Sequence, residues 1–253
     1  MPYVVLLLIL TLLRAPLGAH GDLGEQIVAV TREIGVKPRQ PALYLKRGEL
    51  YRAMRNWDAA LADYDRAASL DPRLAVVDLA RGKLLLEAGQ LEAALAALDR
   101  LLDRQPDHGE GLITRARVLV RLGRSAAAAE EYTRGIARVR RVLPEHYLER
   151  AEAQSACGRV EEAIRGLDEG IGKLGPVVTL ELMAIDLEVG RKRYEAALAR
   201  LERITARSPR KDPWLARRGE ILENAGRRRE ARAAYREALA ALESLPPARR
   251  NSP

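Results

Sequence analysis

One stretch decides the fold: "LYLKRGELYRAMRNWDAALADYDRAASLDP", which runs from Leu43 to Pro72. It reads as two helical segments joined by a short polar turn. It ends in a proline, which has no backbone N–H and therefore stops a helix. Small residues fall inside both segments, at Gly48, Ala60 and Ala67. Small side chains at these places let two helix backbones approach closely, so the stretch predicts a helical hairpin.

The composition of the whole chain also favours helices. The 253 residues are 47% hydrophobic and 31% charged, but only 4% are aromatic and none is Phe. Leu and Ala must therefore fill most of the core, and such a composition is typical of helical proteins. No alternating run of β-branched residues predicts a sheet.

The hairpin stretch recurs along the chain with a fixed period. Aligned copies start at residues 41, 75, 109, 144, 178 and 212, so they are 34 or 35 residues apart. A period of this length is typical of a solenoid of helical hairpins. We expect six repeats, at 41–74, 75–108, 109–143, 144–177, 178–211 and 212–245. A capping helix at 22–40 would precede them, and a disordered tail at 246–253 would follow.

Particular positions of the repeat carry the pattern, counted from each repeat start. Position 20 is always alanine: Ala60, Ala94, Ala128, Ala163, Ala197 and Ala231. Position 8 is small in every repeat except the fifth: Gly48, Gly82, Ala116, Ala151, Ile185 and Gly219. Position 24 is bulky and would fill the space between hairpins: Tyr64, Leu98, Tyr132, Leu167, Leu201 and Tyr235. Four glycines would end first helices, because glycine favours the left-handed turn there: Gly89, Gly123, Gly158 and Gly226.

Two repeats depart from this pattern. In the fifth, Ile185 occupies the small position and Gly190 comes two residues early. We therefore expect a shifted first helix there and a longer turn at "GRKRY". In the third, no proline occurs before Pro144, so "RVRRVL" is expected to extend the second helix.

The repeat resembles that of the tetratricopeptide repeat family over residues 41–245. The resemblance implies an all-α, right-handed α-α superhelical solenoid of helix-turn-helix hairpins. It also implies that the first helices line a concave groove, in which a protein partner or an extended peptide binds. Some members bind the C-terminal carboxylate of chaperones through a Lys/Asn/Arg clamp. Leu45 and Glu49 stand where that clamp needs Lys and Asn, which argues against this activity.

Positions on one stripe of the first helices would face the groove. The predicted groove residues are Leu45, Glu49, Leu79, Lys83, Ile113, Arg117, Arg121, Leu148, Glu152 and Glu220. The middle of this groove would be basic and its C-terminal half acidic, which fits a peptide or helix of complementary charge. The alternative is that exposed inner-face residues are simply hydrophilic.

Position 7 carries an arginine in five repeats. A ladder for an anionic polymer is one interpretation of this row. We expect instead that each arginine pairs with a carboxylate of a neighbouring helix while its stem packs. The five residues are Arg47, Arg81, Arg115, Arg150 and Arg218.

No constellation of residues predicts chemistry. The chain has three histidines, and the motifs HExxH, CxxC, GxSxG and GxxxxGK[ST] do not occur in it. Cys157 is the only cysteine, so no disulfide can form within the chain. We therefore expect no enzymatic activity, no metal site and no cofactor.

The first residues read as a targeting segment. Val4–Leu13 is a short apolar run, and the small residues of "APLGAHG" follow it. This predicts a signal peptide over residues 1–21, cut after Ala19 or Gly21, and a periplasmic or secreted protein. The run is shorter than the roughly 20 residues of a membrane span, so no integral span is expected after its removal. Because no Lys or Arg precedes it, an uncleaved anchor or a misassigned start are the alternatives.

These features favour a non-enzymatic scaffold outside the cytoplasm, one that helps to assemble or stabilise an envelope or secreted complex. Two other hypotheses stay open. The chain could be an accessory subunit of an exported enzyme, or contact a second copy, through a last hairpin that leaves Tyr235, Leu239 and Leu242 partly uncovered. Its basic faces could also bind an anionic polymer or membrane surface, since the net charge is +8. Acids alternate with most of the bases, so nucleic acid is not an expected partner.

Overall fold

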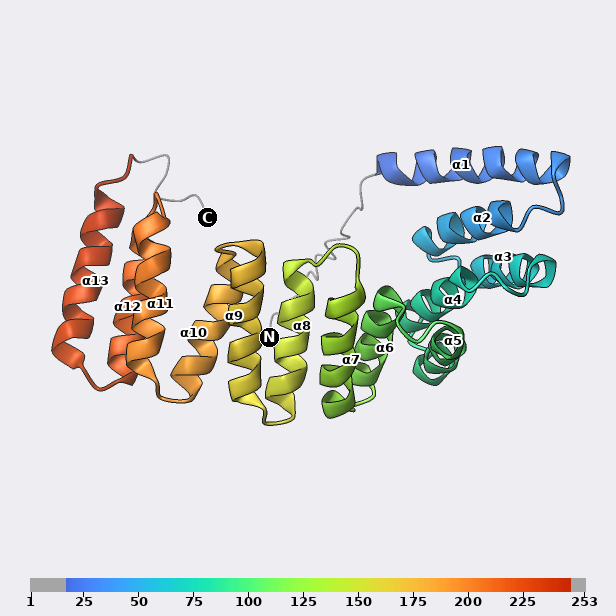
Figure 1. The fold of residues 1–253 in the computed structure, drawn as a ribbon. Helices are drawn as coiled ribbons and strands as arrows, with labels where there is room; N and C mark the ends of the chain where they lie inside the picture. Colours follow the sequence, from blue (N-terminus) through green and yellow to red (C-terminus); the bar gives the residue numbers. More distant parts are fainter. Residues whose placement is uncertain (1–16, 247–253) are drawn as a thin grey trace, which may run out of the picture. The chain divides into compact units, whose positions relative to one another are not determined.

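The computed structural model describes residues 17–246, with side chains from Asp22 onward. In this range every regular element is an α-helix (Figure 1). The signal segment at residues 1–16 and the tail at residues 247–253 lie outside the described residues. The predicted all-α repeat fold is confirmed.

Helices follow α1 (Leu17–Val36) as hairpins, each a first helix packed on the second helix after it. The first helices are α2 (Pro41–Ala53), α4 (Val76–Glu87), α6 (Gly109–Arg121), α8 (Pro144–Ala156), α10 (Val178–Gly190) and α12 (Asp212–Asn224). The second helices are α3 (Trp57–Leu70), α5 (Leu91–Arg104), α7 (Ser125–Arg138), α9 (Val160–Leu174), α11 (Tyr194–Arg207) and α13 (Arg228–Glu243). The chain divides into two compact units, one ending at Gln105 and one beginning at Pro106. Within the second unit, α6 to α13 lie side by side in chain order (Figure 1).

The small residue at position 8 makes room for the bulky residue at position 24 of the same hairpin. A Cβ added at Gly48 would lie 2.5 Å from Cε1 of Tyr64 and 3.3 Å from the carbonyl oxygen of Ala60. A Cβ added at Gly219 would similarly lie 2.4 Å from Cε1 of Tyr235. Position 24 therefore fills the helix crossing within its own hairpin, and in these two hairpins the tyrosine ring occupies the space that a Cβ at position 8 would need.

In the turn after each first helix, the residue at position 15 has a left-handed backbone conformation. The predicted glycines Gly89, Gly123, Gly158 and Gly226 have φ between 73° and 82°, and Arg55 and Lys192 take the same place with φ 59°. Because Lys192 is in register with them, the expected shift and longer turn of the fifth repeat are wrong. Gly190 lies inside the last turn of α10, with open space around it. Ile185 is fully buried beside Ala184, which stands where most repeats have the position-7 arginine.

The expected extension of the third repeat's second helix is also wrong. α7 ends at Arg138, and Val139 takes an extended conformation with ψ 139°. Val139 lies against the start of α6, where a Cβ on Gly109 would come within 2.4 Å of its nitrogen. Leu143 is extended too, as the residue before a proline tends to be, and Pro144 opens α8. Tertiary contact and Pro144 thus replace the missing proline.

α1 lies against the first hairpin and runs from Leu17 to Val36. It packs on α2, and Val30 and Ile34 are 1% and 9% exposed. Arg47 Nη1 also donates to Thr31 Oγ1 at 3.1 Å. α1 begins at Leu17, within the segment expected to be a signal peptide. Among residues 17–246, no helix has the length and apolar character that crossing a membrane requires.

Candidate interaction surfaces

The position-7 arginines are engaged inside the fold. Arg47 forms a two-pronged pair with Asp63, at 2.8 and 2.7 Å. The other pairs are Arg81 with Asp65, Arg115 with Glu131 at 2.8 Å, Arg150 with Glu169 at 2.8 Å and Arg218 with Glu237 at 3.6 Å. The structural role predicted for them is confirmed, because each joins a first helix to a second helix.

The predicted apolar strip of the groove is narrower than expected. Leu79 and Ile113 are 5% and 2% exposed, so they belong to the core and offer no surface to a ligand. Ile113 packs against α7 of its own hairpin, where a Cβ added at Gly135 would lie 2.7 Å from its Cγ1. Leu45 and Leu148 are half-buried, and Leu148 packs against the cluster that contains Tyr147 and Leu167.

Several of the predicted polar groove residues form hydrogen bonds with other side chains of the fold. Arg117 Nε donates to the carboxylate of Glu149 at 3.0 and 3.1 Å, which joins α6 to α8. Glu49 accepts a hydrogen bond from the hydroxyl of Tyr64 at 2.6 Å. The remaining predicted residues are the half-buried Lys83 and the exposed Arg121, Glu152 and Glu220.

The second unit brings together one acidic residue from each of three first helices. These residues are Glu152 of α8, Asp186 of α10 and Glu220 of α12, all at position 9 and all exposed. α8 contacts α10, and Arg217 of α12 pairs with both Asp186 and Glu220. We call the surface formed by Glu152, Asp186 and Glu220 with the half-buried Leu148 and Leu182 the first-helix face. Leu45, Glu49, Leu79 and Lys83 lie in the first unit and are not part of it.

Tyrosines at position 24 hold inner-face carboxylates in place. The hydroxyl of Tyr64 reaches Glu49, and that of Tyr235 donates to Glu223 at 3.1 Å. Burial, with the hydrogen bond to Glu49, raises the pKa of Tyr64 far above its ordinary value, so the hydroxyl keeps its proton and donates it. The repeat pattern predicts these tyrosines as packing residues and does not reveal the hydrogen bonds of their hydroxyl groups.

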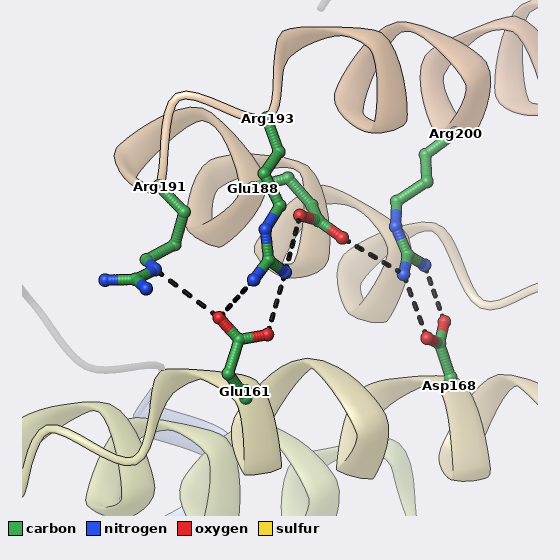
Figure 2. Close-up of polar contacts among 6 residues, drawn as sticks. All are labelled: Glu161, Asp168, Glu188, Arg191, Arg193 and Arg200. Carbon is green, nitrogen blue, oxygen red and sulfur yellow. Dashed lines mark hydrogen bonds and ion pairs between the residues drawn. The ribbon is translucent and has the colours of Figure 1, made fainter.

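A network of charges joins the fourth and fifth hairpins (Figure 2). Arg200 donates from Nη1 and Nη2 to Asp168 at 2.6 and 2.9 Å, and Glu188 lies 3.7 Å from its guanidinium. Arg193 bridges Glu188 and Glu161, at 3.5 and 2.7 Å. The hydrogen bond to Asp168 raises the pKa of Arg200, and that to Arg193 lowers the pKa of Glu161.

The repeat pattern does not predict this network, because the fifth repeat has its arginine at position 23 and not at position 7. Position 7 is Ala184 and position 23 is Arg200, whereas the first and third repeats have Arg at position 7 and an acid at position 23. Arg200 therefore reaches back to the preceding hairpin. Glu188 and Arg200 are 5% and 9% exposed, so the centre of the network is buried in the hairpin joint, whereas Glu161 and Asp168 lie at its solvent-accessible edge.

The described residues also hold few groups suited to chemistry. No cluster of three His, Cys, Asp or Glu residues that could hold a metal ion occurs among them. His146 is 7% exposed, and its Nδ1 accepts the N–H of Leu143 at 3.3 Å. Burial and the nearby Arg117 lower the pKa of His146. An open cleft of about 440 Å³ in the first unit is lined in part by Asp78, whose carboxylate is held by Arg100 and Arg104.

The helical hairpins are stacked, and their position-7 arginines pair with carboxylates of the same fold. These features define a helical-repeat protein of the class that serves protein interaction. Family models agree: one for the tetratricopeptide repeat matches residues 45–108 and 79–138, and one for a tetratricopeptide repeat-like domain matches residues 142–250. The chain belongs to the tetratricopeptide repeat family. Proteins of this family bind protein or peptide partners and are generally not catalytic.

Solved structures with the same fold cover most of the chain. The C-terminal part of a repeat protein of this family from Cytophaga hutchinsonii is 16% identical, with a TM-score of 0.71 over 90% of this chain and 92% of that one. PilF of Pseudomonas aeruginosa is 18% identical, with a TM-score of 0.60 over 76% and 86%. A tetratricopeptide repeat protein from Parabacteroides merdae is 21% identical, with a TM-score of 0.57 over 88% of both chains. At such identities the likeness shows the fold alone. No curated protein sequence matches the chain.

Proposed function

We propose that this chain is a non-enzymatic scaffold that acts outside the cytoplasm and binds a protein or peptide partner on its first-helix face. One observation carries the proposal. Glu152, Asp186 and Glu220 repeat at the same position of three first helices and stay exposed beside Leu148 and Leu182. Glu152 has no ion-pair partner in the described part of the chain. An exposed charged row beside half-buried leucines suits a partner that supplies both opposite charge and apolar side chains.

The internal pairing of other charges supports this choice of surface. The position-7 arginines pair with carboxylates of the fold, which removes the ladder that an anionic polymer would need. The groove half that sequence analysis described as basic includes Arg117, which is committed to Glu149. In the acidic row, Glu152 has no ion-pair partner among the described residues, and Asp186 and Glu220 share the single guanidinium of Arg217.

The proposal is tested by capturing partners from the source cell envelope with residues 22–253 as bait. We compare the unchanged chain with the variant Glu152→Lys plus Glu220→Lys. The matched control, Glu92→Lys plus Glu202→Lys, makes the same charge change at exposed positions of second helices. A protein recovered by crosslinking with the unchanged chain and the control, but not with the first-helix-face variant, is the expected result. Equal recovery with both variants, after circular dichroism shows that both fold, would sink the proposal.

Action outside the cytoplasm rests on the apolar run Val4–Leu13 and the small residues after it. It would place the partner in an envelope or secreted complex. N-terminal sequencing of the chain purified from fractionated source cells tests this part separately. The expected amino terminus is His20 or Asp22, in the envelope or secreted fraction. An intact Met1 terminus in the cytoplasmic fraction contradicts it.

A further inference from the structure

At the last two joints between hairpins of the second unit, the charges on the second helices follow one rule. The preceding hairpin supplies a carboxylate from its second helix, and the following hairpin supplies an arginine. Glu161 meets Arg193 at 2.7 Å across the joint of the fourth and fifth hairpins. Glu195 meets Arg227 at 2.6 Å across the next joint. The carboxylates in these pairs stand at position 18, and Asp168, which pairs with Arg200, stands at position 25.

The last hairpin reverses this rule at the positions that would receive a following hairpin. Position 18 reads Asp58, Glu92, Ala126, Glu161 and Glu195 in the first five repeats, and Arg229 in the last. Position 25 reads Asp65, Asp99, Thr133, Asp168 and Glu202, and then Arg236. Position 21 reads Leu61, Leu95, Ala129, Ile164 and Leu198, and then Arg232. All three substitutions are to arginine, and their spacing of three and four residues puts them on one stripe of α13.

The same stripe ends in an exposed apolar residue. Leu239 stands at position 28 and is 56% exposed, whereas its equivalents Leu102 and Ile136 are 7% and 4% exposed. We call Arg229, Arg232, Arg236 and Leu239 the terminal face. It lies on α13, the last helix drawn in colour in Figure 1. On this stripe, arginine replaces the residues found at positions 18, 21 and 25 of the other repeats, while position 28 holds a leucine.

The guanidinium groups of the terminal face are not neutralised by α13 itself. Its acids Glu230 and Glu237 turn to Arg227 and Arg218 of their own hairpin. Arg232 donates to a backbone oxygen, and the part of the chain that the structure describes gives none of the three arginines a carboxylate partner. Three exposed arginines and one leucine are thus available to bind a molecule outside the hairpin.

We infer that the terminal face docks an acidic amphipathic helix of a partner protein. Guanidinium groups bind carboxylates in two-pronged pairs and are weakly hydrated, which suits an interface. One turn of an incoming helix brings its carboxylates opposite arginines spaced by three and four residues, and an apolar side chain on the same face covers Leu239. This inference rests on the proposed scaffold role but uses a different surface, so either can fail without the other.

The arginines of the terminal face also disfavour the docking of a further hairpin like those of this chain. A further hairpin of the kind found here would approach with its arginines, as Arg193, Arg200 and Arg227 do at the internal joints. Arginine facing arginine is repulsive, so end-to-end growth by such hairpins is disfavoured while an acidic partner is accepted.

The test measures binding of two labelled peptides to residues 22–253 by fluorescence anisotropy. One peptide is a helical sequence with glutamates at i, i+3 and i+7 and a leucine at i+10, and the other has lysines in place of the glutamates. The variant Arg229→Glu, Arg232→Glu and Arg236→Glu reverses the charge of the terminal face. The control Arg73→Glu, Arg140→Glu and Arg141→Glu makes the same net change at exposed residues elsewhere.

We expect the unchanged chain and the control to bind the glutamate peptide alike, and the terminal-face variant to bind it at least about tenfold more weakly. Leu239→Glu should also weaken binding with the three arginines intact, and the lysine peptide should not bind. No binding by the unchanged chain, or equal loss in the control, would overturn the inference.

Two further arms separate other occupants. If the chain bound phosphatidylglycerol vesicles through the three arginines and did not bind the peptide, the terminal face would be assigned to a membrane surface. If sedimentation velocity showed self-association that Leu239→Glu abolishes, and the peptide did not bind, the terminal face would be assigned to a second copy of the chain. Either result would overturn the acidic helix as occupant, and neither bears on capture through Glu152 and Glu220.

Discussion

Gly48 shows how one missing side chain sets a helix crossing. The ring of Tyr64 is fully buried against it, and a Cβ at Gly48 would lie 2.5 Å from Cε1 of that ring. We expect Gly48→Ala to lower the free energy of unfolding by about 1–3 kcal/mol, because a packed core cannot accept the added atom without moving the ring. Urea unfolding followed by circular dichroism measures this.

Gly172 provides the control for that substitution, since a Cβ there meets nothing within 4 Å and the residue lies in helix α9. Gly172→Ala should leave stability unchanged or raise it by up to about 1 kcal/mol, as expected for helix propensity. If the two alanines behaved alike, close packing at position 8 would not be what the glycine serves.

Arg200 neutralises two carboxylates at the joint of the fourth and fifth hairpins. Its removal in Arg200→Ala leaves Glu188 buried beside Arg193 alone, and Asp168 without its two-pronged partner. Breaking a buried pair is strongly destabilising, so we expect a loss of about 2–4 kcal/mol in urea unfolding. Arg203→Ala, an exposed residue of the same helix, should change stability by less than about 0.5 kcal/mol. A similar small effect at Arg200 would mean that the network contributes no net stability.

We expect His146 to make the stability of the fold depend on pH in the mildly acidic range. Its pKa is lowered by burial and by Arg117, so the unfolded chain takes up a proton at a higher pH than the folded chain does. Stability from this group is therefore complete above the unfolded pKa of about 6.5 and is lost as the pH falls toward the folded pKa. We expect His146→Gln, which keeps an acceptor for Leu143, to reduce the loss of stability between about pH 7 and pH 5. Identical pH profiles for both chains in urea unfolding would exclude this role for His146.

At the scale of the helix, the turn at position 15 determines where every first helix ends. Four repeats use glycine there with φ between 73° and 82°, whereas Lys192 adopts φ 59° at a cost that glycine avoids. We expect Lys192→Gly to raise the free energy of unfolding by about 1 kcal/mol. Gly123→Ala, at the equivalent turn, should lower it by a similar amount. No gain from Lys192→Gly would show that the lysine stem packs well enough to offset the strained backbone.

The whole molecule is stabilised by contacts between neighbouring hairpins, so the loss of an end element should have local effects. α1 covers α2 through Val30 and Ile34. A chain that begins at Lys37 should show faster amide hydrogen exchange in α2 and α3 than one that begins at Asp22, with exchange in α8 to α13 unchanged. Faster exchange throughout both units would instead mean that the two units unfold together.

The two surfaces proposed for binding belong to this scale as well. The first-helix face needs α8, α10 and α12 side by side, whereas the terminal face exists because no further hairpin covers α13 among the described residues. The first-helix face takes its charge from one repeat position on three helices, whereas the terminal face takes its charge from three positions of one helix. Glu161 and Asp168 pair with arginines of the following hairpin, whereas Arg229 and Arg236 at the same positions have no carboxylate partner among the described residues.

By itself the sequence determined the hairpins, their period and the pairing of the position-7 arginines, because small residues, glycine and proline act locally and recur every 34 or 35 residues. Only the tertiary structure decided three further matters. α7 stops at Arg138 because Val139 packs on Gly109, and α10 keeps its register because Lys192 accepts a left-handed turn. Leu79 and Ile113 left the groove for the core because a helical stripe gives a direction and not the neighbour that covers it.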